Sequence, residues 1–238
     1  MICAILIGRK GSKGFPGKNL KKINGKRMCE YPLLAAKRTK SIEKIFVSTD
    51  CPIIKKISKK YNATILERPK KLTSSKALGD HVFENAYFQI KKKIKKIKYV
   101  VLLFANAPLV TSKMIEAGIK ILNKNKKCDS AVSTSVYNMW SPLRARKLHK
   151  DGFLKPFVKF EYFGNPKKLN CDRDSQGNVY FADMSVSVVR PHCLENLKSG
   201  LLPQKWMGKK IAPIKTWGGF DIDYEWQMPL LKHRLKQK

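Results

Sequence analysis

Residues 8–19 combine glycine with positive charge, and they read GRKGSKGFPGKN. Glycine lets backbone N–H groups approach an anion closely. The basic side chains that add positive charge for a phosphate are Arg9, Lys10, Lys13 and Lys18. The spacing is neither GxGxxG nor GxxxxGKS/T, which excludes the usual dinucleotide and P-loop motifs. The segment therefore predicts a phosphate-binding loop of another type.

Asp221 and Asp223 form a second candidate site near the C-terminus. Residues two positions apart in an extended segment point to the same side, so both carboxylates can share a hard cation such as Mg²⁺ or Mn²⁺. Gly218 and Gly219 precede the pair and allow the backbone to approach closely. We interpret the pair as a metal site. The alternative that Asp223 only caps the last helix stays open.

The elements that must position these residues are apolar runs separated by segments of helical period. Strands are expected at residues 2–7, 44–48, 63–66, 99–104 and 130–135. Helices are expected from Pro52, from about Asp80 and after Thr111. Nearly continuous Ile, Val and Leu is typical of parallel strands covered on both faces. We therefore predict an α/β fold with an open, mostly parallel sheet flanked by helices, and ligands at the carboxyl ends of its strands.

Two finer expectations concern the helices. The helix from Pro52 is expected to turn Ile53, Ile54, Ile57 and Tyr61 inward. Asp50 is expected to cap it, with a catalytic role as the less favoured alternative. The lysine-rich run 91–98 is expected to continue the helix from Asp80, with its lysines on a solvated face.

The pattern changes after residue 137. Residues 138–182 mix aromatic residues, proline, glycine and charges without a helical period. We interpret them as a small inserted β-rich lobe, for dimerisation or substrate binding, within a single domain of residues 1–238. Beyond it we expect a strand at 184–190, a short helix from Pro191, a strand at 211–215 and a final helix over 223–235.

Four segments together resemble the acylneuraminate cytidylyltransferases, which are the CMP-sialic acid synthetases and their relatives for other nine-carbon sugar acids. The resemblance rests on the GSKGFPGKN sequence preceded by Arg9, on Ser48-Thr49-Asp50, on Arg68-Pro69 and on Asp221-Ile222-Asp223. It extends from Ile2 to about Trp226. It implies a fold of the nucleotide-diphospho-sugar transferase type.

The resemblance also implies an activity. CMP would pass from CTP to the anomeric hydroxyl of a nonulosonic (sialic-acid-like) sugar acid, releasing pyrophosphate, in a step that depends on Mg²⁺ or Mn²⁺. The implied catalytic residues are Arg9, Lys13, Lys18 and Asp223, and Asp221 and Asp223 would hold the metal. The implied nucleotide-binding residues are Arg9, Ser12, Lys13, Lys18, Asn19, Arg68 and Asn106. The product would serve the synthesis of surface glycans such as lipopolysaccharide.

The sugar side of the site departs from the family. Where the family usually has QPTSP, residues 104–108 read FANAP, which leaves Asn106 and backbone as the polar groups. Candidate sugar-binding residues in the lobe are Arg144, Tyr162 and Arg173. A synthetase for a Kdo-type 2-keto-3-deoxy sugar acid remains an alternative, as does a regulator that has kept the scaffold without the activity.

The charge of the chain suggests a competing class of function. Its 238 residues include 50 Lys+Arg and 17 Asp+Glu, a formal charge of +33, which also suits a basic nucleic-acid-binding α/β protein. Only nine of the basic residues are Arg, whereas recognition of phosphate and guanine favours Arg. We therefore favour one nucleotide as the phosphate partner.

Cysteine usage and hydropathy indicate the setting. Six separated cysteines and the lack of any apolar stretch near 18 residues are typical of a cytoplasmic protein without membrane insertion. We expect a homodimer there, with CTP and a nine-carbon sugar acid as its ligands.

Overall fold

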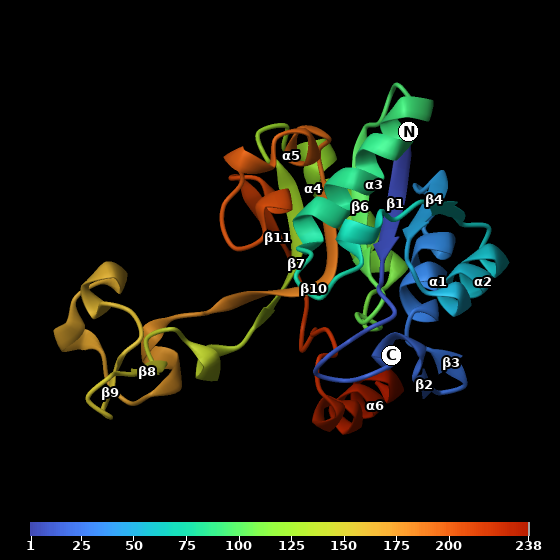
Figure 1. The fold of residues 1–238 in the computed structure, drawn as a ribbon. Helices are drawn as coiled ribbons and strands as arrows, with labels where there is room; N and C mark the ends of the chain where they lie inside the picture. The colour runs from blue at the N-terminus through green and yellow to red at the C-terminus, as the bar shows by residue number, and fades with distance from the viewer. Residues whose placement is uncertain (238) are drawn as a thin grey trace.

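The computed structural model describes residues 1–237, apart from the side chain of Arg173. A seven-stranded sheet with the order β11-β7-β10-β6-β1-β4-β5 forms its centre (Figure 1). The strands are β1 Ile2–Ile7, β4 Lys44–Ser48, β5 Thr64–Leu66, β6 Tyr99–Phe104, β7 Ser130–Val136, β10 Tyr180–Val189 and β11 Ile211–Lys215. All neighbours pair in parallel except β10, which is antiparallel to both β6 and β7. The predicted open, mostly parallel sheet is confirmed.

Helices cover both faces of this sheet. They are α1 Glu30–Arg38, α2 Pro52–Lys60, α3 Gly79–Lys93, α4 Ser112–Lys124 and α5 His192–Glu195. The last helix, α6 Met228–Lys236, packs instead in a third cluster with Phe15, Ile23 and Ile222. One core cluster joins α1, α2 and α4 to the sheet, and a second joins α3 and α5 to the other face. Successive residues of β1 enter opposite clusters, Leu6 the first and Ile5 the second. Because β1 is buried on both faces, its sequence is apolar throughout.

Local signals explain where some helices begin. Pro52 occupies the first turn of α2. Backbone N–H groups in that turn have no partner within the helix, so proline loses no hydrogen bond there. The Thr111 side chain accepts a hydrogen bond from the Met114 N–H and caps α4. Asp50 was wrongly expected to cap α2, because Cys51 is the N-cap residue and no side chain caps that end. Ile53 was also expected to face inward, yet it is 45% exposed.

Other elements also differ from the prediction, and β10 begins at Tyr180 where a strand was expected from residue 184. Helix α3 ends at Lys93 and the backbone of Ile94 is extended, so run 91–98 is not one helix; Ile94 and Ile97 still pack against the core. The last helix begins at Met228 and leaves Asp223 in the preceding loop. A hairpin of β2 Lys22–Ile23 and β3 Lys26–Arg27, followed by α1, was not expected. Its turn is Asn24-Gly25, with φ of 47° and 78°, as a two-residue hairpin requires.

Residues 138–182 lie away from the body of the molecule, at the far ends of β7 and β10 (Figure 1). This lobe contains one hairpin, formed by β8 Arg146–Leu148 and β9 Leu154–Pro156, and several single turns of 3-10 helix. Its apolar side chains are largely exposed, including Phe153 at 71% and Leu154 at 67%. Dimerisation through this lobe stays a prediction. Within residues 1–237 no helix is long and apolar enough to cross a membrane.

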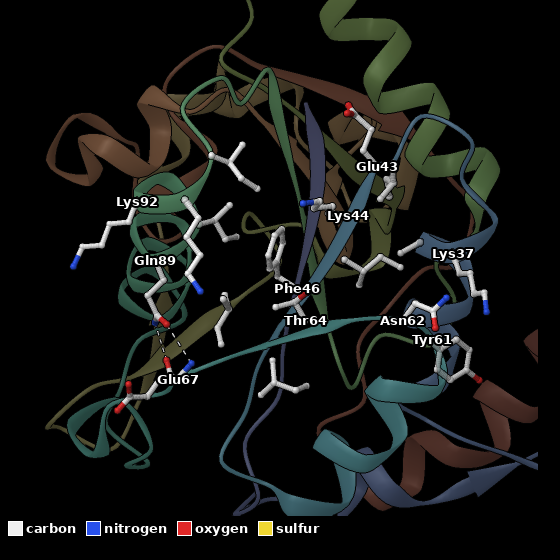
Figure 2. Close-up of a pocket in the computed structure, with 18 residues that line it drawn as sticks. Lys37, Glu43, Lys44, Phe46, Tyr61, Asn62, Thr64, Glu67, Gln89 and Lys92 are labelled. Carbon is white, nitrogen blue, oxygen red and sulfur yellow. Dashed lines mark hydrogen bonds between the residues drawn. The ribbon is translucent and has the colours of Figure 1, made fainter.

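The edge of the sheet beyond β4 is only partly covered. Strand β5 pairs with the second half of β4, and a groove of about 790 Å³ lies against this edge, as Figure 2 shows. The rim of the groove carries Lys37, Lys44, Lys92 and Lys93. Gln89 reaches from α3 to the backbone of Glu67, donating to its carbonyl (2.7 Å) and accepting from its N–H (3.2 Å). Gln89 thus closes the end of the edge strand.

Candidate nucleotide site

A second cavity, of about 350 Å³, lies at the carboxyl ends of β1 and β6, beside the loop of residues 8–19. It is lined by every residue predicted to bind the nucleotide, namely Arg9, Ser12, Lys13, Lys18, Asn19, Arg68 and Asn106, and also by Asp223. Sheet topology explains the assembly, because parallel strands deliver their following loops to one edge. We call this cavity the nucleotide pocket.

Three side-chain hydrogen bonds, two of them from outside the loop, hold its shape. The Lys10 N–H donates to Asp50 Oδ1 (2.8 Å), so Asp50 anchors the loop instead of capping α2. Asn19 Nδ2 donates to the Arg9 carbonyl (3.1 Å) and Arg68 Nη1 donates to the Gly8 carbonyl (3.2 Å). A Cβ on Gly8 would lie 2.6 Å from the Cβ of Ala105, which explains why glycine is needed there.

Two residues that line the pocket each have a buried polar atom without a hydrogen-bond partner. Asn19 Oδ1 and Arg68 Nε have no hydrogen-bond partner among the residues that the structure describes. An unsatisfied buried polar atom costs about 1–3 kcal/mol, so a hydrogen bond to either atom would be favourable. Burial lowers the pKa of Arg68, and the nearby Asp50 opposes that effect. The pocket therefore offers one acceptor and one donor beside a cluster of positive charges.

Of the Asp pair, Asp223 lines this pocket, whereas Asp221 is not a lining residue and is held beside it by Asn106. Lys18 Nζ contacts Asp223 Oδ1 in a salt bridge. Asn106 Nδ2 donates to Asp221 Oδ2 (2.9 Å) and to the Ile222 carbonyl (3.0 Å), and the Ile222 N–H donates back to the Asn106 carbonyl (2.8 Å). Burial raises the pKa of Asp221, and the negative charge of Asp223 raises it further. The two carboxylates are therefore close enough to repel one another, and Lys18 partly neutralises them.

This donor set fits one divalent cation bound together with phosphate. Among the described residues no group of three or more His, Cys, Asp or Glu side chains could hold a metal ion. Mg²⁺ is commonly bound by one or two carboxylates together with substrate phosphates. Two carboxylates beside a phosphate loop match that pattern.

The predicted sugar-binding residues are not brought to the pocket within one chain. Arg144 lines a separate cavity of about 400 Å³ inside the lobe, together with Arg146 and Phe160. Tyr162 is 76% exposed. The side chain of Arg173 lies outside the part of the chain that the structure describes.

The pocket also contains residues that the prediction did not include. Tyr224 lines it and stacks on Trp226 with an interplanar angle of 11°. Tyr224 follows Asp223 directly in the sequence, and this position could have indicated that it lies at the pocket. Ser75 lines the opposite wall, beside the Ser74 carbonyl that accepts a hydrogen bond from Arg9 Nη1 (3.1 Å).

Comparison with known proteins agrees with this geometry. Residues 3–195 match the model of a family described as cytidylyltransferase. The chain belongs to the cytidylyltransferase family. The matched region contains the loop of residues 8–19, Arg68 and Asn106, and it ends before Asp221 and Asp223.

Individual members of the family share about 30% sequence identity with this chain. The chain is 28% identical over 188 residues to the CMP-N,N'-diacetyllegionaminic acid synthase of Legionella pneumophila, covering 76% of this chain and 77% of that protein. It is 30% identical over 146 residues to the pseudaminic acid cytidylyltransferase and UDP-2,4-diacetamido-2,4,6-trideoxy-beta-L-altropyranose hydrolase of Helicobacter pylori. That match covers 61% of this chain and 28% of the relative's length. The predicted resemblance to enzymes named for nine-carbon sugar acids is confirmed at the level of the family.

Solved structures show the same fold. CMP:2-keto-3-deoxy-manno-octonic acid synthetase complexed with CTP has a TM-score of 0.69 and 13% identity, over 99% of this chain and 98% of that one. A 4-diphosphocytidyl-2C-methyl-D-erythritol synthase has a TM-score of 0.66 and 10% identity, over 98% and 97%. The expected nucleotide-diphospho-sugar transferase-like architecture is thus confirmed.

Proposed function

We propose that this protein transfers CMP from CTP to the anomeric hydroxyl of a nonulosonic acid and releases pyrophosphate. The observation that carries the proposal is the nucleotide pocket, which a positively charged loop, Asn19, Arg68 and Asp223 line together, with Asp221 hydrogen-bonded to the lining residue Asn106. Family membership supports the nucleotide chemistry, and the names of the Legionella and Helicobacter relatives support a nine-carbon acid as acceptor.

The proposed reaction depends mainly on neutralising the negative charge of the triphosphate, and it needs no covalent intermediate with the protein. The sugar hydroxyl attacks the α-phosphorus, and the bond from that phosphorus to the bridging oxygen of pyrophosphate breaks. Negative charge grows on the phosphate oxygens, where Arg9, Lys13 and Lys18 stabilise it. Asn19 and Arg68 would bind the nucleoside with the atoms left unsatisfied in the pocket. Mg²⁺ or Mn²⁺ held by Asp221 and Asp223 would supply further positive charge.

The proposal extends to assembly and location. The exposed apolar side chains of the lobe suit contact with a second copy of this chain, which would make a homodimer. All six cysteines are unpaired and five are buried, as is typical of a reducing cytoplasm, where CTP is available.

A pyrophosphate-release assay tests the proposed reaction. Purified protein is given CTP, Mg²⁺ and, separately, sialic, legionaminic, pseudaminic and Kdo-type acids. We expect a CMP-sugar with at least one nine-carbon acid, and loss of turnover when EDTA removes the metal. Turnover with the Kdo-type acid alone would favour the alternative synthetase, and no turnover with any acid would contradict the proposal.

A matched pair of variants tests the metal assignment. Asp223→Asn should reduce turnover at least 100-fold, because it removes a charged ligand. Asp151→Asn replaces an exposed carboxylate in the lobe and should leave turnover unchanged.

A gel shift at physiological salt tests the nucleic-acid alternative, which requires DNA or RNA binding with a steep salt dependence.

A further inference from the structure

A buried carboxylate lies behind the nucleotide pocket and takes no part in the proposed chemistry. Asp183 is in β10 and only 4% exposed. We propose that Asp183 is a positioning residue which, through Ser135 and Gly219, sets the place of the Asp221–Asp223 pair and thereby the affinity of the site for a divalent cation. This inference rests on the proposed function, because it takes that pair to be the metal site.

The surroundings of Asp183 match an ionised carboxylate. Its Oδ1 accepts hydrogen bonds from Ser133 Oγ (2.5 Å) and the Ser185 N–H (3.1 Å). Its Oδ2 accepts from Ser135 Oγ (2.8 Å) and Thr216 Oγ1 (2.5 Å). A carboxylate has only acceptors, and four donors offset much of the cost of burying its charge. The group therefore joins β7, β10 and the residue that follows β11.

The backbone is irregular where it presents this side chain. The pairing of β10 with β7 shifts in register between Ala182 and Ser187. Met184, within that irregularity, has φ of 59°. A left-handed conformation at a residue other than glycine is strained and persists only where its surroundings impose it. The bulge is thus a specific feature that places the Asp183 carboxylate under the chain leading to the Asp pair.

A direct connection runs from Asp183 to that chain. Ser135 Oγ, which donates to Asp183, accepts a hydrogen bond from the Gly219 N–H (2.8 Å). The Gly219 carbonyl accepts from the Tyr137 hydroxyl (2.9 Å). A Cβ on Gly219 would overlap the Asp183 carboxylate, so the backbone packs directly on it. Both polar groups of Gly219 are therefore held by this part of the sheet.

Gly219 is only two residues from Asp221. The segment 219–223 is thus held at two points, at Gly219 by the Asp183 network and at Asp221 and Ile222 by Asn106. Loosening the first point should let the carboxylates drift apart or turn away. Displacements of about 1 Å can reduce a site's activity about 100-fold.

Two variants break this connection in different ways. Asp183→Asn keeps the shape but replaces one acceptor oxygen with a donor that faces other donors. Ser135→Ala removes the hydrogen bonds of the Ser135 hydroxyl to Asp183, Thr216 and Gly219. It leaves the Ser133 and Thr216 bonds to Asp183 in place, and it is the second variant if Asp183→Asn folds poorly. Asp129→Asn is the matched control. That carboxylate also accepts two backbone N–H bonds, from Lys209 (2.8 Å) and Lys210 (2.9 Å), but it lies just before β7, at the opposite end of that strand.

The readout is Mn²⁺ binding in the presence of CTP, measured by electron paramagnetic resonance and needing no turnover. We expect the apparent Kd of Mn²⁺ to rise at least tenfold in Asp183→Asn and Ser135→Ala, and less than twofold in Asp129→Asn. Where turnover is measurable, the Mg²⁺ concentration for half-activation should rise in parallel, with the KM for CTP at saturating Mg²⁺ little changed.

Several results would overturn the inference. Unchanged Mn²⁺ affinity in folded Ser135→Ala would do so, as would an equal rise in Asp129→Asn, while the proposed function would stand. Wild-type protein that binds no Mn²⁺ with CTP would overturn both. Wild-type protein that binds Mn²⁺ but turns over no sugar acid would contradict the proposed acceptor alone, and the positioning role would still be decided by the variants.

Discussion

Arg68 holds the loop and is also proposed to bind the nucleotide. One of its N–H groups is used on the Gly8 carbonyl, and its Nε remains unsatisfied in the pocket. A lysine at this position would keep the positive charge but lose the planar set of donors. Replacing Arg68 by lysine therefore tests whether nucleotide binding needs the planar guanidinium or only its positive charge.

Arg68→Lys should raise the KM for CTP about 10-fold or more, because hydrogen bonds to charged groups contribute about 1.5–3 kcal/mol. Initial rates at varied CTP measure this effect. Arg190→Lys is the control, since Arg190 donates to the carbonyls of Cys128 and Leu122 outside the pocket. It should lower the melting temperature and leave the KM for CTP unchanged. An equal KM in Arg68→Lys and wild type would contradict the assignment of Arg68.

At the scale of elements, the contact of α4 with the sheet depends on Gly118. A Cβ there would lie 2.6 Å from Val188 Cγ2 and 2.7 Å from Ile214 Cδ1, both on buried side chains. Gly118→Ala gains about 1 kcal/mol of helix propensity but introduces overpacking that costs about 1–3 kcal/mol. We therefore expect a lower free energy of unfolding in urea.

Lys120→Ala is the control, because Lys120 lies on the exposed face of α4. It should not destabilise the protein. A Gly118→Ala variant more stable than wild type would contradict the prediction and show that the contact between α4 and the sheet can rearrange to hold the extra methyl group.

The contact of α5 with α3 predicts a pH dependence. The Glu195 carboxylate accepts hydrogen bonds from Lys91 and Tyr87, and these lower its pKa. A carboxyl group with a lowered pKa stabilises the fold above its unfolded value, and this contribution is lost as the pH falls through the folded value. The contribution should therefore be present at pH 7 and disappear below about pH 4.5.

Glu195→Gln should lower the melting temperature at pH 7 by about 1–4 °C, because a partly exposed pair contributes at most about 1 kcal/mol. The difference from wild type should close on acidification. Thermal unfolding at a series of pH values measures both effects. Glu225→Gln, an exposed carboxylate elsewhere, should show no such difference. If the melting temperatures of Glu195→Gln and wild type differed by the same amount down to pH 3, the stabilisation would not come from the charge of Glu195.

At the scale of the whole molecule, the lobe is the feature that a single chain does not explain. It projects from the body and exposes apolar side chains that monomers usually bury. Phe153→Asp should convert the expected dimer, of twice 27.2 kDa, into a monomer in light scattering after size exclusion. Lys150→Asp changes charge on the same lobe without removing apolar area and should leave the dimer intact. A monomeric wild type would contradict the proposed assembly.

Sequence reasoning succeeded where one local pattern determined the element. The continuous apolar runs of β1, β4 and β6 predicted their bounds residue for residue. It failed where short elements or distant contacts decided the outcome. The strands β2 and β3 have two residues each, too few for any periodicity, although Asn24-Gly25 marked their turn.

The site divides in the same way. That the glycine-rich loop, Arg68, Asn106 and Asp223 meet at one pocket could be predicted, because the carboxyl ends of parallel strands share one edge of the sheet; their roles toward phosphate and metal stay predictions. The role of Asp183 could not, since it depends on a bulge in β10 that brings three separate segments together. Asp50 was misinterpreted for a related reason, because its partner, the Lys10 N–H, is 40 residues away in the chain.

The amide of Gln89 has a consequence for how molecules of this protein can meet. The sheet has β5 at one edge and β11 at the other, so pairing β5 of one copy with β11 of the next would repeat without end and build a filament. Gln89 occupies the backbone groups of Glu67, directly after β5, and the groove beside this edge is lined by charged side chains, four lysines together with Glu43 and Glu67. The edge thereby resists open-ended polymerisation.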